Sequence, residues 1–343
     1  MSRKRICAAV GALLLTGTAL VTVPTTAGAV DDRPTAVVSL GDSAMSGEGA
    51  GSYEPGTAGE NGNWCHRSTQ SMIHRTQLAQ RTINLACSGA DSANVSLADT
   101  VHYTEGSQAR RLIDIARQYR VTTVVVQVGA NDDVRFADTM VDCVAAWANP
   151  FGSSCRSKLE REWPGRLAAM APKVENALSD VRSAMSQAGY AASSYNLVLT
   201  SYASPVTEKM DRILHGPQGC PLRLADAGYG RTTAVPQLSD ALRGVASRAG
   251  VKFLDFARAT ENREACSKGD SSSGEWQRRL TVDPYALVTG GLDAIGLHLA
   301  QQSFHPNAAG HEQMGRCITE FINSGTGSAR CLAGADGNLH AVA

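Results

Sequence analysis

The sequence predicts an α/β fold in which helices cover a mostly parallel sheet. Two observations predict it. Short apolar, β-branched runs of strand length recur along the chain, and stretches with helical periodicity separate them. In such a sheet, ligands bind beyond the carboxyl ends of the strands, so the polar clusters that follow the first strands are the places to look for a site.

The expected elements follow one another in a regular order. Strands are expected at residues 36–40 (AVVSL), 83–86 (the weakest), 122–128 (TTVVVQV), 197–200 (LVLT) and 251–256 (VKFLDF). Helices are expected near residues 68–80, 108–120, 158–187 with interruptions at Pro164 and Pro172, 235–249, and after Pro306. Three segments have neither strand-like nor helical periodicity, namely 45–63, 201–229 and 266–299. They either line a substrate cleft or form surface loops held by disulfides.

The N-terminus has the pattern of a secretory signal peptide. Three basic residues, Arg3–Arg5, precede an apolar stretch over 6–23, and Ala27-Gly28-Ala29 supplies the small residues of a cleavage site. A retained anchor is less favoured, because glycine and threonine interrupt an apolar run that is short for a membrane span. We therefore expect a signal peptide at 1–29, one domain over 30–322, and a poorly ordered Gly/Ser/Ala-rich tail over 323–343.

The charge balance argues against nucleic acid as a partner. Without the three basic residues of the signal, 29 Lys and Arg face 32 Asp and Glu, and no basic block remains. Such a chain has no electrostatic footprint for nucleic acid and no polybasic membrane patch.

Eight cysteines remain after the signal is removed, an even number in an exported chain, which favours disulfides. Their connectivity is not fixed by the sequence. Pairing neighbours is favoured because each bridge then closes a short loop within one region, which gives Cys65–Cys87, Cys143–Cys155, Cys220–Cys266 and Cys317–Cys331. A zinc site is disfavoured because there is no C-x-x-C pair.

The ends of the first three strands carry the residues that could perform chemistry. The first strand runs into Gly41-Asp42-Ser43, which places a hydroxyl on a tight turn near backbone N–H donors. The next two end in Cys87-Ser88-Gly89-Ala90 and Gly129-Ala130-Asn131-Asp132. The Gly89 N–H and the Asn131 amide could both point at the site above Ser43. Taken alone, each motif also fits an ordinary turn.

Together with His305-Pro306-Asn307, these blocks resemble the four motifs of the SGNH hydrolase (GDSL esterase/lipase) superfamily, and the match spans Val37 to about Phe321. The cysteine pattern and the stretch VPQLSDALRGVA look like its secreted actinomycete esterases, lipases and phospholipases. The resemblance implies a three-layer α/β/α sandwich with a flavodoxin-like sheet of about five strands. It also supports the neighbour pairing of the cysteines.

By the same resemblance, Ser43 is the nucleophile and His305 its base. The Ser43 and Gly89 N–H groups and the Asn131 amide would form the oxyanion hole. The implied protein is a secreted, monomeric esterase that needs no metal or cofactor and acts on a carboxylic ester, with a lipid-like ester as the expected substrate.

One residue departs from the superfamily pattern. The usual D-x-x-H reads Gln302-Ser303-Phe304-His305 here, so the histidine lacks the customary carboxylate. A backbone carbonyl can accept the Nδ1–H bond that fixes the tautomer. Gln302 C=O is the first candidate and Ser303 C=O the second, and a distant carboxylate such as Asp293 is a third option.

Other polar residues are expected to have local roles. His66 and His74 are interpreted as surface or packing residues, and His311 falls on a different part of the last helix from His305. Asp132 and Asp133 are expected to cap or solvate the turn after Asn131.

Three alternatives for function remain open. A polysaccharide deacetylase would use the same chemistry on another substrate, and a noncatalytic cell-surface or carbohydrate-binding protein could share the scaffold. The sequence does not separate a lipase from a phospholipase. A G-x-S-x-G elbow is absent, which disfavours the α/β-hydrolase fold.

Overall fold

The computed structural model describes residues 31–149, 151–281, 298 and 300–343. The compact unit Arg33–Ala343 is the part discussed below. The expected signal peptide at 1–29 and the alternative acid Asp293 lie outside the described residues.

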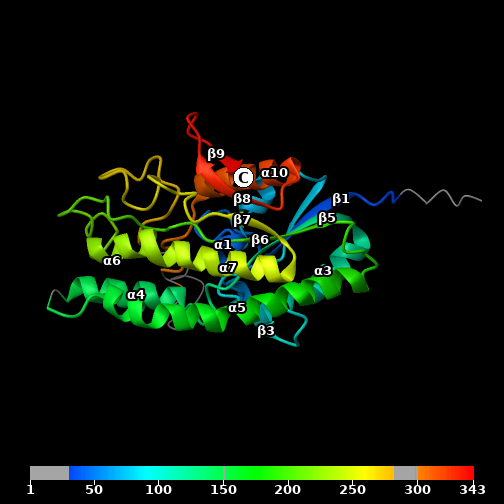
Figure 1. Ribbon diagram of the computed structural model, residues 1–343, viewed down its shortest axis with the longest axis horizontal. Coiled ribbons are helices and arrows are strands. Elements are labelled where there is room, and N and C mark those ends of the chain that lie inside the picture. Colours follow the sequence, from blue (N-terminus) through cyan, green and yellow to red (C-terminus); the bar gives the residue numbers. More distant parts are fainter. Residues whose placement is uncertain (1–30, 150, 282–297, 299) are drawn as a thin grey trace, which may run out of the picture. The chain divides into compact units, whose positions relative to one another are not determined.

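A seven-stranded sheet forms the centre of this unit, in the order β2-β1-β5-β6-β7-β8-β9 (Figure 1). Neighbouring strands are parallel throughout, except that β9 runs antiparallel to β8. The strands are β1 (Thr35–Gly41), β2 (Arg81–Asn84), β5 (Arg120–Gln127), β6 (Asn196–Thr200), β7 (Lys252–Asp255), β8 (Ser328–Ala333) and β9 (Leu339–Val342). The predicted α/β fold with a mostly parallel sheet is confirmed. A separate antiparallel pair consists of β3 (Val101–His102) and β4 (Glu105–Gly106).

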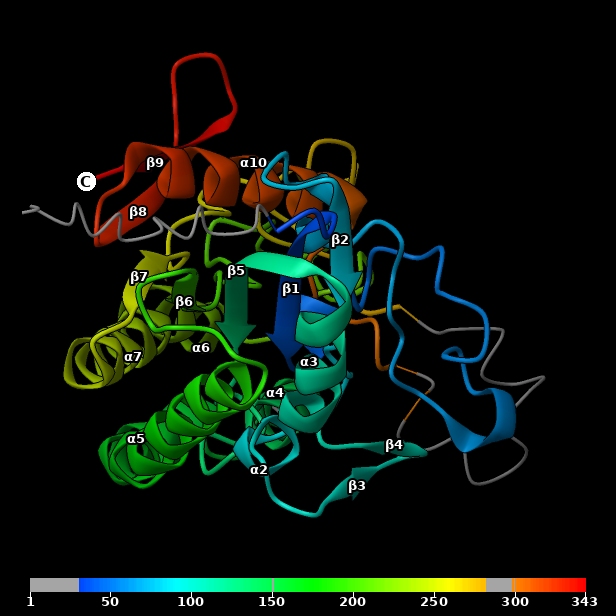
Figure 2. The same ribbon diagram turned by 90° about the vertical axis from the view of Figure 1, so that its right-hand side faces the viewer.

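Helices cover both faces of the sheet (Figure 2). On one face α3 (Gln108–Gln118), α5 (Cys155–Gln187) and α7 (Val235–Ala249) share a buried apolar cluster with alternate strand residues such as Val38 and Val124. On the other face the 3₁₀ turn η2 (Met72–Arg75) and α10 (Ala308–Ser324) pack with Val37 and Val125. Strands buried on both faces read as continuous apolar runs, which is why the sequence revealed them.

Short helices complete the unit. They are α1 (Ser43–Ser46), α2 (Ser92–Val95), α4 (Phe136–Ala148), α6 (Leu224–Tyr229), the 3₁₀ turn η1 (Glu60–Gly62) and the π-helical turn η3 (Gly230–Ala234). Polar caps set several boundaries. The Ser107 hydroxyl accepts from Arg110 N at 3.2 Å where α3 begins, and Asn307 Oδ1 accepts from Gly310 N at 3.0 Å where α10 begins.

The helix expected over residues 68–80 is wrong, since only η2 forms there. Side chains in this segment form local bonds and bonds to other parts of the chain. Ser68 Oγ donates to Gly51 O and accepts from Gln70 N, and the Ser71 hydroxyl accepts from Asn84 Nδ2. Such bonds compete with helical hydrogen bonding.

The interruption expected in the long helix is also wrong. α5 is one helix of 33 residues that contains both Pro164 and Pro172. Each proline removes one helical N–H, but packing of the buried face, which includes Trp163, Met170 and Val174, holds the helix on the sheet. α4 was not anticipated.

The poorly ordered tail predicted over 323–343 is wrong as well, because β8 and β9 extend the sheet at this end. Cys331 in β8 is bridged to Cys317 in α10, and Leu339 in β9 is fully buried. The disulfide and the buried Leu339 therefore hold this segment in the sheet, although its composition favours disorder.

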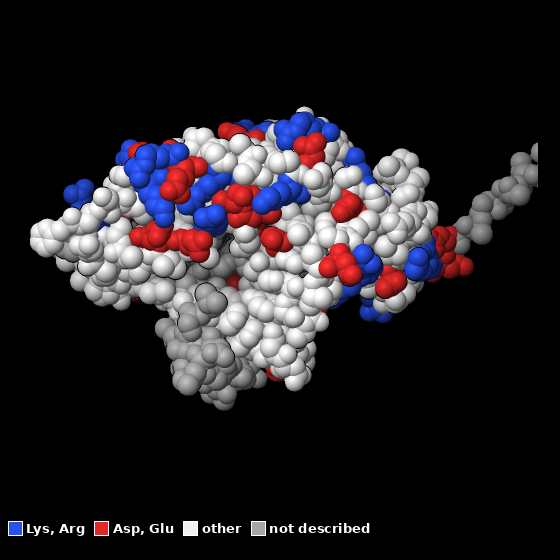
Figure 3. Space-filling model, turned by 90° about the horizontal axis from the view of Figure 1, so that it is seen from below, with Lys and Arg blue, Asp and Glu red and all other residues white. Residues whose placement is uncertain are grey.

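Four disulfides join the cysteines in the neighbour pairing favoured above, namely Cys65–Cys87, Cys143–Cys155, Cys220–Cys266 and Cys317–Cys331. On the face shown in Figure 3, Lys and Arg lie among Asp and Glu. In the part of the chain that the structure describes, no helix is both long and apolar enough to cross a membrane.

Candidate active site

Ser43 stands at the carboxyl end of β1 on a tightly constrained turn. Gly41 has a φ of 145°, and a Cβ built there would lie 2.0 Å from the Gln127 carbonyl oxygen, so only glycine lets β1 pass this close to β5. Asp42 then caps α1, its Oδ1 accepting from Ala44 N at 3.1 Å. Ser43 is the first residue of that helix.

His305 reaches Ser43 from the loop before α10. Its Nε2 lies 2.8 Å from Ser43 Oγ, and its Nδ1 lies 3.0 Å from the Ser303 carbonyl oxygen. A carbonyl only accepts, so Nδ1 carries the proton and Nε2 is free to accept from the serine hydroxyl. The orienting carbonyl is thus Ser303, the second of the two candidates, and not Gln302. The backbone at Phe304 explains this choice of carbonyl. Phe304 has a left-handed φ of 59°, which turns the chain between Ser303 and His305.

The loop that carries His305 is fixed by main-chain bonds. Arg278 N donates to His305 O at 2.8 Å, and Phe304 N donates to Arg278 O at 3.0 Å. Burial lowers the pKa of His305 below its ordinary value of 6.5. The imidazole is therefore neutral and ready to accept a proton at neutral pH.

The candidate oxyanion donors lie on the segments that follow β1, β2 and β5. Cys87 N donates to Gly41 O at 3.1 Å, which brings the segment that holds Gly89 next to the nucleophile turn. Asn131 Nδ2 donates to Ala90 O at 2.9 Å, and this bond uses one of its two hydrogens. Among the described residues, the Ser43 and Gly89 N–H groups have no acceptor. These donors are therefore available to a ligand.

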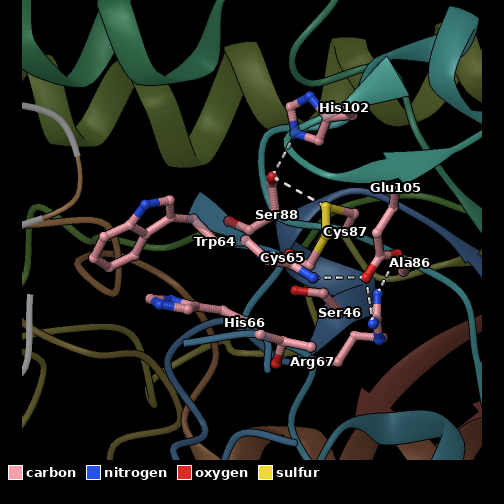
Figure 4. Close-up of a disulfide and its surroundings, with 12 residues drawn as sticks. Ser46, Trp64, Cys65, His66, Arg67, Ala86, Cys87, Ser88, His102 and Glu105 are labelled. Carbon is pink, nitrogen blue, oxygen red and sulfur yellow. Dashed lines mark hydrogen bonds and ion pairs between the residues drawn. A yellow bond between two sulfur atoms is a disulfide. The ribbon is translucent and has the colours of Figure 1, made fainter. Parts of the chain in front are cut away.

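The Cys65–Cys87 disulfide holds this segment in place (Figure 4). Beside it, the Ser88 carbonyl lies 2.8 Å from His102 Nε2. Asp132 and Asp133 bind neighbouring groups. Asp132 Oδ2 accepts from Ser92 Oγ at 2.8 Å, and Asp133 pairs with Lys173 at 2.7 Å.

Behind the serine, Asp42 is a fully buried carboxyl. The Tyr202 hydroxyl donates a hydrogen bond to its Oδ2. Burial raises the pKa of Asp42 from 3.8 to about 7, against the lowering effect of the bonds from Tyr202 and Ala44. Burial likewise raises the pKa of Asp132 to about 6.

A mostly apolar cavity extends from the Ser43–His305 pair. It contains roughly 1180 Å³ of empty space, its open mouth included, and Ser43, Asn131 and His305 all line it. Its apolar walls come from α4, α5, α6 and α7, through Phe136, Met140, Leu159, Trp163, Tyr229 and Leu238. Hydrophobic and aromatic walls with a few placed polar groups are typical of a small-molecule site.

Sequence reasoning missed two residues near the pair. Glu48 is fully buried in the glycine-rich segment after α1, and His66 is 1% exposed with its Nδ1 2.8 Å from Glu48 Oε1. His66 is therefore a buried partner of a carboxylate and not a surface residue. A lone acid between Gly47 and Gly49, five residues after the nucleophile, was the available signal.

A comparison with protein families decides what this site belongs to. The model of the GDSL-like Lipase/Acylhydrolase family matches residues 39–313. The chain belongs to the GDSL-like lipase/acylhydrolase family. The predicted family is confirmed, and this lipase/acylhydrolase is a carboxylic ester hydrolase.

Individual proteins resemble this GDSL-like acylhydrolase over most of its length. Lipase 2 of Streptomyces coelicolor is 25% identical over 286 residues, which cover 81% of this chain and 82% of that protein. The extracellular lipase of Streptomyces rimosus has a TM-score of 0.57 at 22% identity, with 85% of this chain and all of that one covered. Phospholipase A1 of Streptomyces albidoflavus has the same score and identity, with 86% of this chain and all of that one covered. The two solved structures show the same fold.

Proposed function

We propose that the chain is an exported serine esterase or lipase that hydrolyses lipid-like esters through an acyl-enzyme on Ser43. The observation that carries the proposal is the 2.8 Å contact between Ser43 Oγ and His305 Nε2 in the wall of a mostly apolar cavity. The four disulfides support export, since such bridges persist in oxidising compartments.

In the acylation step, Ser43 Oγ attacks the ester carbonyl carbon while its proton passes to His305 Nε2. The carbonyl oxygen becomes an oxyanion, which the Ser43 and Gly89 N–H groups and the Asn131 amide stabilise. The bond to the alcohol oxygen then breaks, and His305 returns the proton to the leaving alcohol. The acyl group remains on Ser43.

In the deacylation step, water attacks the acyl carbon and gives a proton to His305 Nε2. The second oxyanion collapses, the bond between the acyl carbon and Ser43 Oγ breaks, and the serine recovers its proton from His305. The Ser303 carbonyl keeps the imidazole in the required tautomer throughout.

The cavity favours an acyl chain over an acetyl group. A deacetylase of polysaccharides needs little apolar volume beside the nucleophile, whereas this site has apolar walls contributed by four helices. Two relatives of the same fold are named a lipase and a phospholipase A1, which supports a lipid-like substrate without choosing between the two.

The test is a substrate profile of the purified chain without residues 1–29. We expect hydrolysis of p-nitrophenyl esters from butyryl upward to exceed that of acetyl, with phospholipid vesicles and acetylated xylan assayed alongside. A fluorophosphonate probe should label the protein, and Ser43→Ala should abolish both labelling and hydrolysis. Labelling that survives in Ser43→Ala, or activity on acetylated xylan alone, would overturn the proposal.

A further inference from the structure

A buried carboxylate lies beside the catalytic pair without touching it. Glu48 follows α1, and its N–H donates to Ser43 O at 3.1 Å. The next residue, Gly49, packs against the histidine loop. A Cβ built there would lie 3.0 Å from His305 Cβ and 2.9 Å from the Pro306 carbonyl oxygen. Glycine thus allows the segment that carries Glu48 to pass directly behind His305.

The Glu48 carboxylate is held from several sides. His66 Nδ1 lies 2.8 and 3.0 Å from its two oxygens, the Tyr53 hydroxyl donates to Oε1 at 3.1 Å, and Gln301 Nε2 donates to Oε2 at 2.8 Å. Figure 4 shows His66 and Arg67 pointing to opposite sides of their segment, with Arg67 toward Glu105. A buried charge is tolerated only when it is paired and hydrogen-bonded in this way.

These contacts keep Glu48 ionised. Burial alone would raise the pKa of Glu48, but the charge and hydrogen bond of His66, with smaller effects of His305 and Ser88, hold it below its ordinary value. The negative charge of Glu48 acts in turn on His305. It raises the pKa of that imidazole against the effect of burial, whereas His66 lowers it.

The reaction needs a negative charge near His305. The imidazole becomes a cation in each transition state, and in a triad a carboxylate stabilises that cation. The Ser303 carbonyl fixes the tautomer but carries only a partial charge. We propose that Glu48 is a positioning residue that supplies this missing charge through space, and that His66 partly offsets it. This inference rests on the proposed serine hydrolase mechanism.

Other titratable or charged groups lie near the catalytic pair. Asp42, directly before Ser43, also changes its charge near neutral pH because burial raises its pKa to about 7, so the His305 pKa has to be read apart from the pH profile of the reaction. His311 is fully buried, and burial lowers its pKa to about 3. Burial and the charge of Glu48 raise the pKa of Tyr53, so its hydroxyl stays neutral. Arg278 is a fixed cation whose Nε donates to Gly49 O. His298 lies one contact further away, with Nδ1 2.6 Å from Gln301 Oε1.

Two single substitutions separate this role from a purely structural one, because they remove groups that shift the pKa of His305 in opposite directions. Glu48→Gln should lower the pKa of His305. His66→Gln should raise it, because the bonds from Tyr53 and Gln301 remain to hold Glu48 ionised. The lower apparent pKa in the pH profile of kcat/KM for p-nitrophenyl butyrate should shift in the same direction as the His305 pKa, by about half a pH unit or more. In Glu48→Gln, kcat should also fall about tenfold. Glu48→Asp keeps the negative charge, so its pH profile of kcat/KM should have the same lower apparent pKa as wild type.

The His305 pKa is also read without turnover, by NMR titration of labelled histidine with His305→Gln for assignment. This readout distinguishes failure of the inference from failure of the proposed function. The matched control is Glu264→Gln, a buried acid outside the cavity wall, which should leave the His305 pKa unchanged. Equal shifts in Glu48→Gln and His66→Gln, or no shift in either, would overturn the inference.

Discussion

At the scale of single residues, the pair of Ser43 and His305 depends on main chain where related sites use a side chain. A carbonyl at 3.0 Å orients the imidazole, and the residues that create this geometry are Phe304 with its left-handed φ and Arg278 with its two main-chain bonds. None of these features requires an acid three residues before the histidine. The glutamine at 302 is therefore compatible with a working base.

The oxyanion assignment predicts a large and specific loss in Asn131→Ala. Removing one oxyanion donor typically lowers kcat by about 100- to 1,000-fold, because charge that develops in the transition state loses a placed hydrogen bond. We expect kcat for p-nitrophenyl butyrate to fall in that range with little change in KM. Asp133→Ala, on the same turn, should stay within a few-fold of wild type. Near-full activity in Asn131→Ala would refute the assignment.

Asp42 predicts a pH dependence of stability. The pKa of Asp42 is raised from 3.8 to about 7 by burial, so folding favours its protonated form. Its contribution to stability is complete below pH 3.8 and is lost as the pH rises through 7. Since one pKa unit corresponds to about 1.4 kcal/mol, the change amounts to a few kcal/mol.

The measurement is urea unfolding of wild type and Asp42→Asn between pH 4 and pH 8. We expect the difference in free energy of unfolding to change in favour of the variant as the pH rises. Parallel curves across this range would show that Asp42 does not titrate there.

The sequence predicted the residues of the site that lie in short, local patterns. Ser43, Gly89 and Asn131 each follow a strand end, so the expected topology alone brings them together. The choice of Gln302 over Ser303 failed because it depended on one backbone angle, φ at Phe304. Glu48 and His66 were missed because their pairing joins two irregular segments, for which periodicity gives no information.

At the scale of elements, prediction succeeded where burial imposed a period. β5 and α7 match their expected ranges to within two residues, since each buries one continuous apolar face or run. It failed where local polar bonds or covalent links decided the outcome. Ser68 and Ser71 replaced an expected helix with a turn, and the Cys317–Cys331 bridge helped to order a tail of weak composition.

That bridge predicts a loss of stability without a loss of chemistry. It closes a loop of 14 residues, for which the chain-entropy model gives about 3 kcal/mol. The double variant Cys317→Ser with Cys331→Ser should therefore lose about that much free energy of unfolding in urea and retain wild-type kcat at 25 °C.

The matched comparison is Cys65→Ser with Cys87→Ser, which frees the turn that holds Gly89. Both pairs should lose stability, but this second pair should also lose kcat. If the first pair loses activity to the same extent, the link from the Cys65–Cys87 disulfide to the oxyanion turn is wrong.

At the scale of the whole molecule, the cavity lies where the helical layer of α4, α5, α6 and α7 meets the carboxyl ends of the central strands. The proposed nucleophile, Ser43, follows a strand end of the sheet, and the apolar walls come from the helices. The reacting groups and the acyl-binding surface therefore lie in different layers. A substitution in the helical wall should change the preference for acyl chain length without changing the chemistry.

Leu159→Trp tests this separation. The larger side chain should fill part of the cavity, since Leu159 lines it from α5. We expect kcat/KM for p-nitrophenyl palmitate to fall at least about tenfold, while that for the acetyl ester, which needs little of the cavity, stays near wild type. Equal losses on both esters would indicate general damage to the fold, and no loss on either would place the acyl chain elsewhere.

The order of the strands also determines where a tag or a solid support can be joined to the enzyme. β9 is the outermost strand at one edge of the sheet, and five steps separate it from β1, which ends two residues before Ser43, the proposed nucleophile. At about 4.8 Å a step, this is roughly 24 Å across the sheet. A tag, a fused partner or a solid support joined after Ala343 would leave the nucleophile turn unobstructed, which makes the C-terminus the preferred handle for immobilisation.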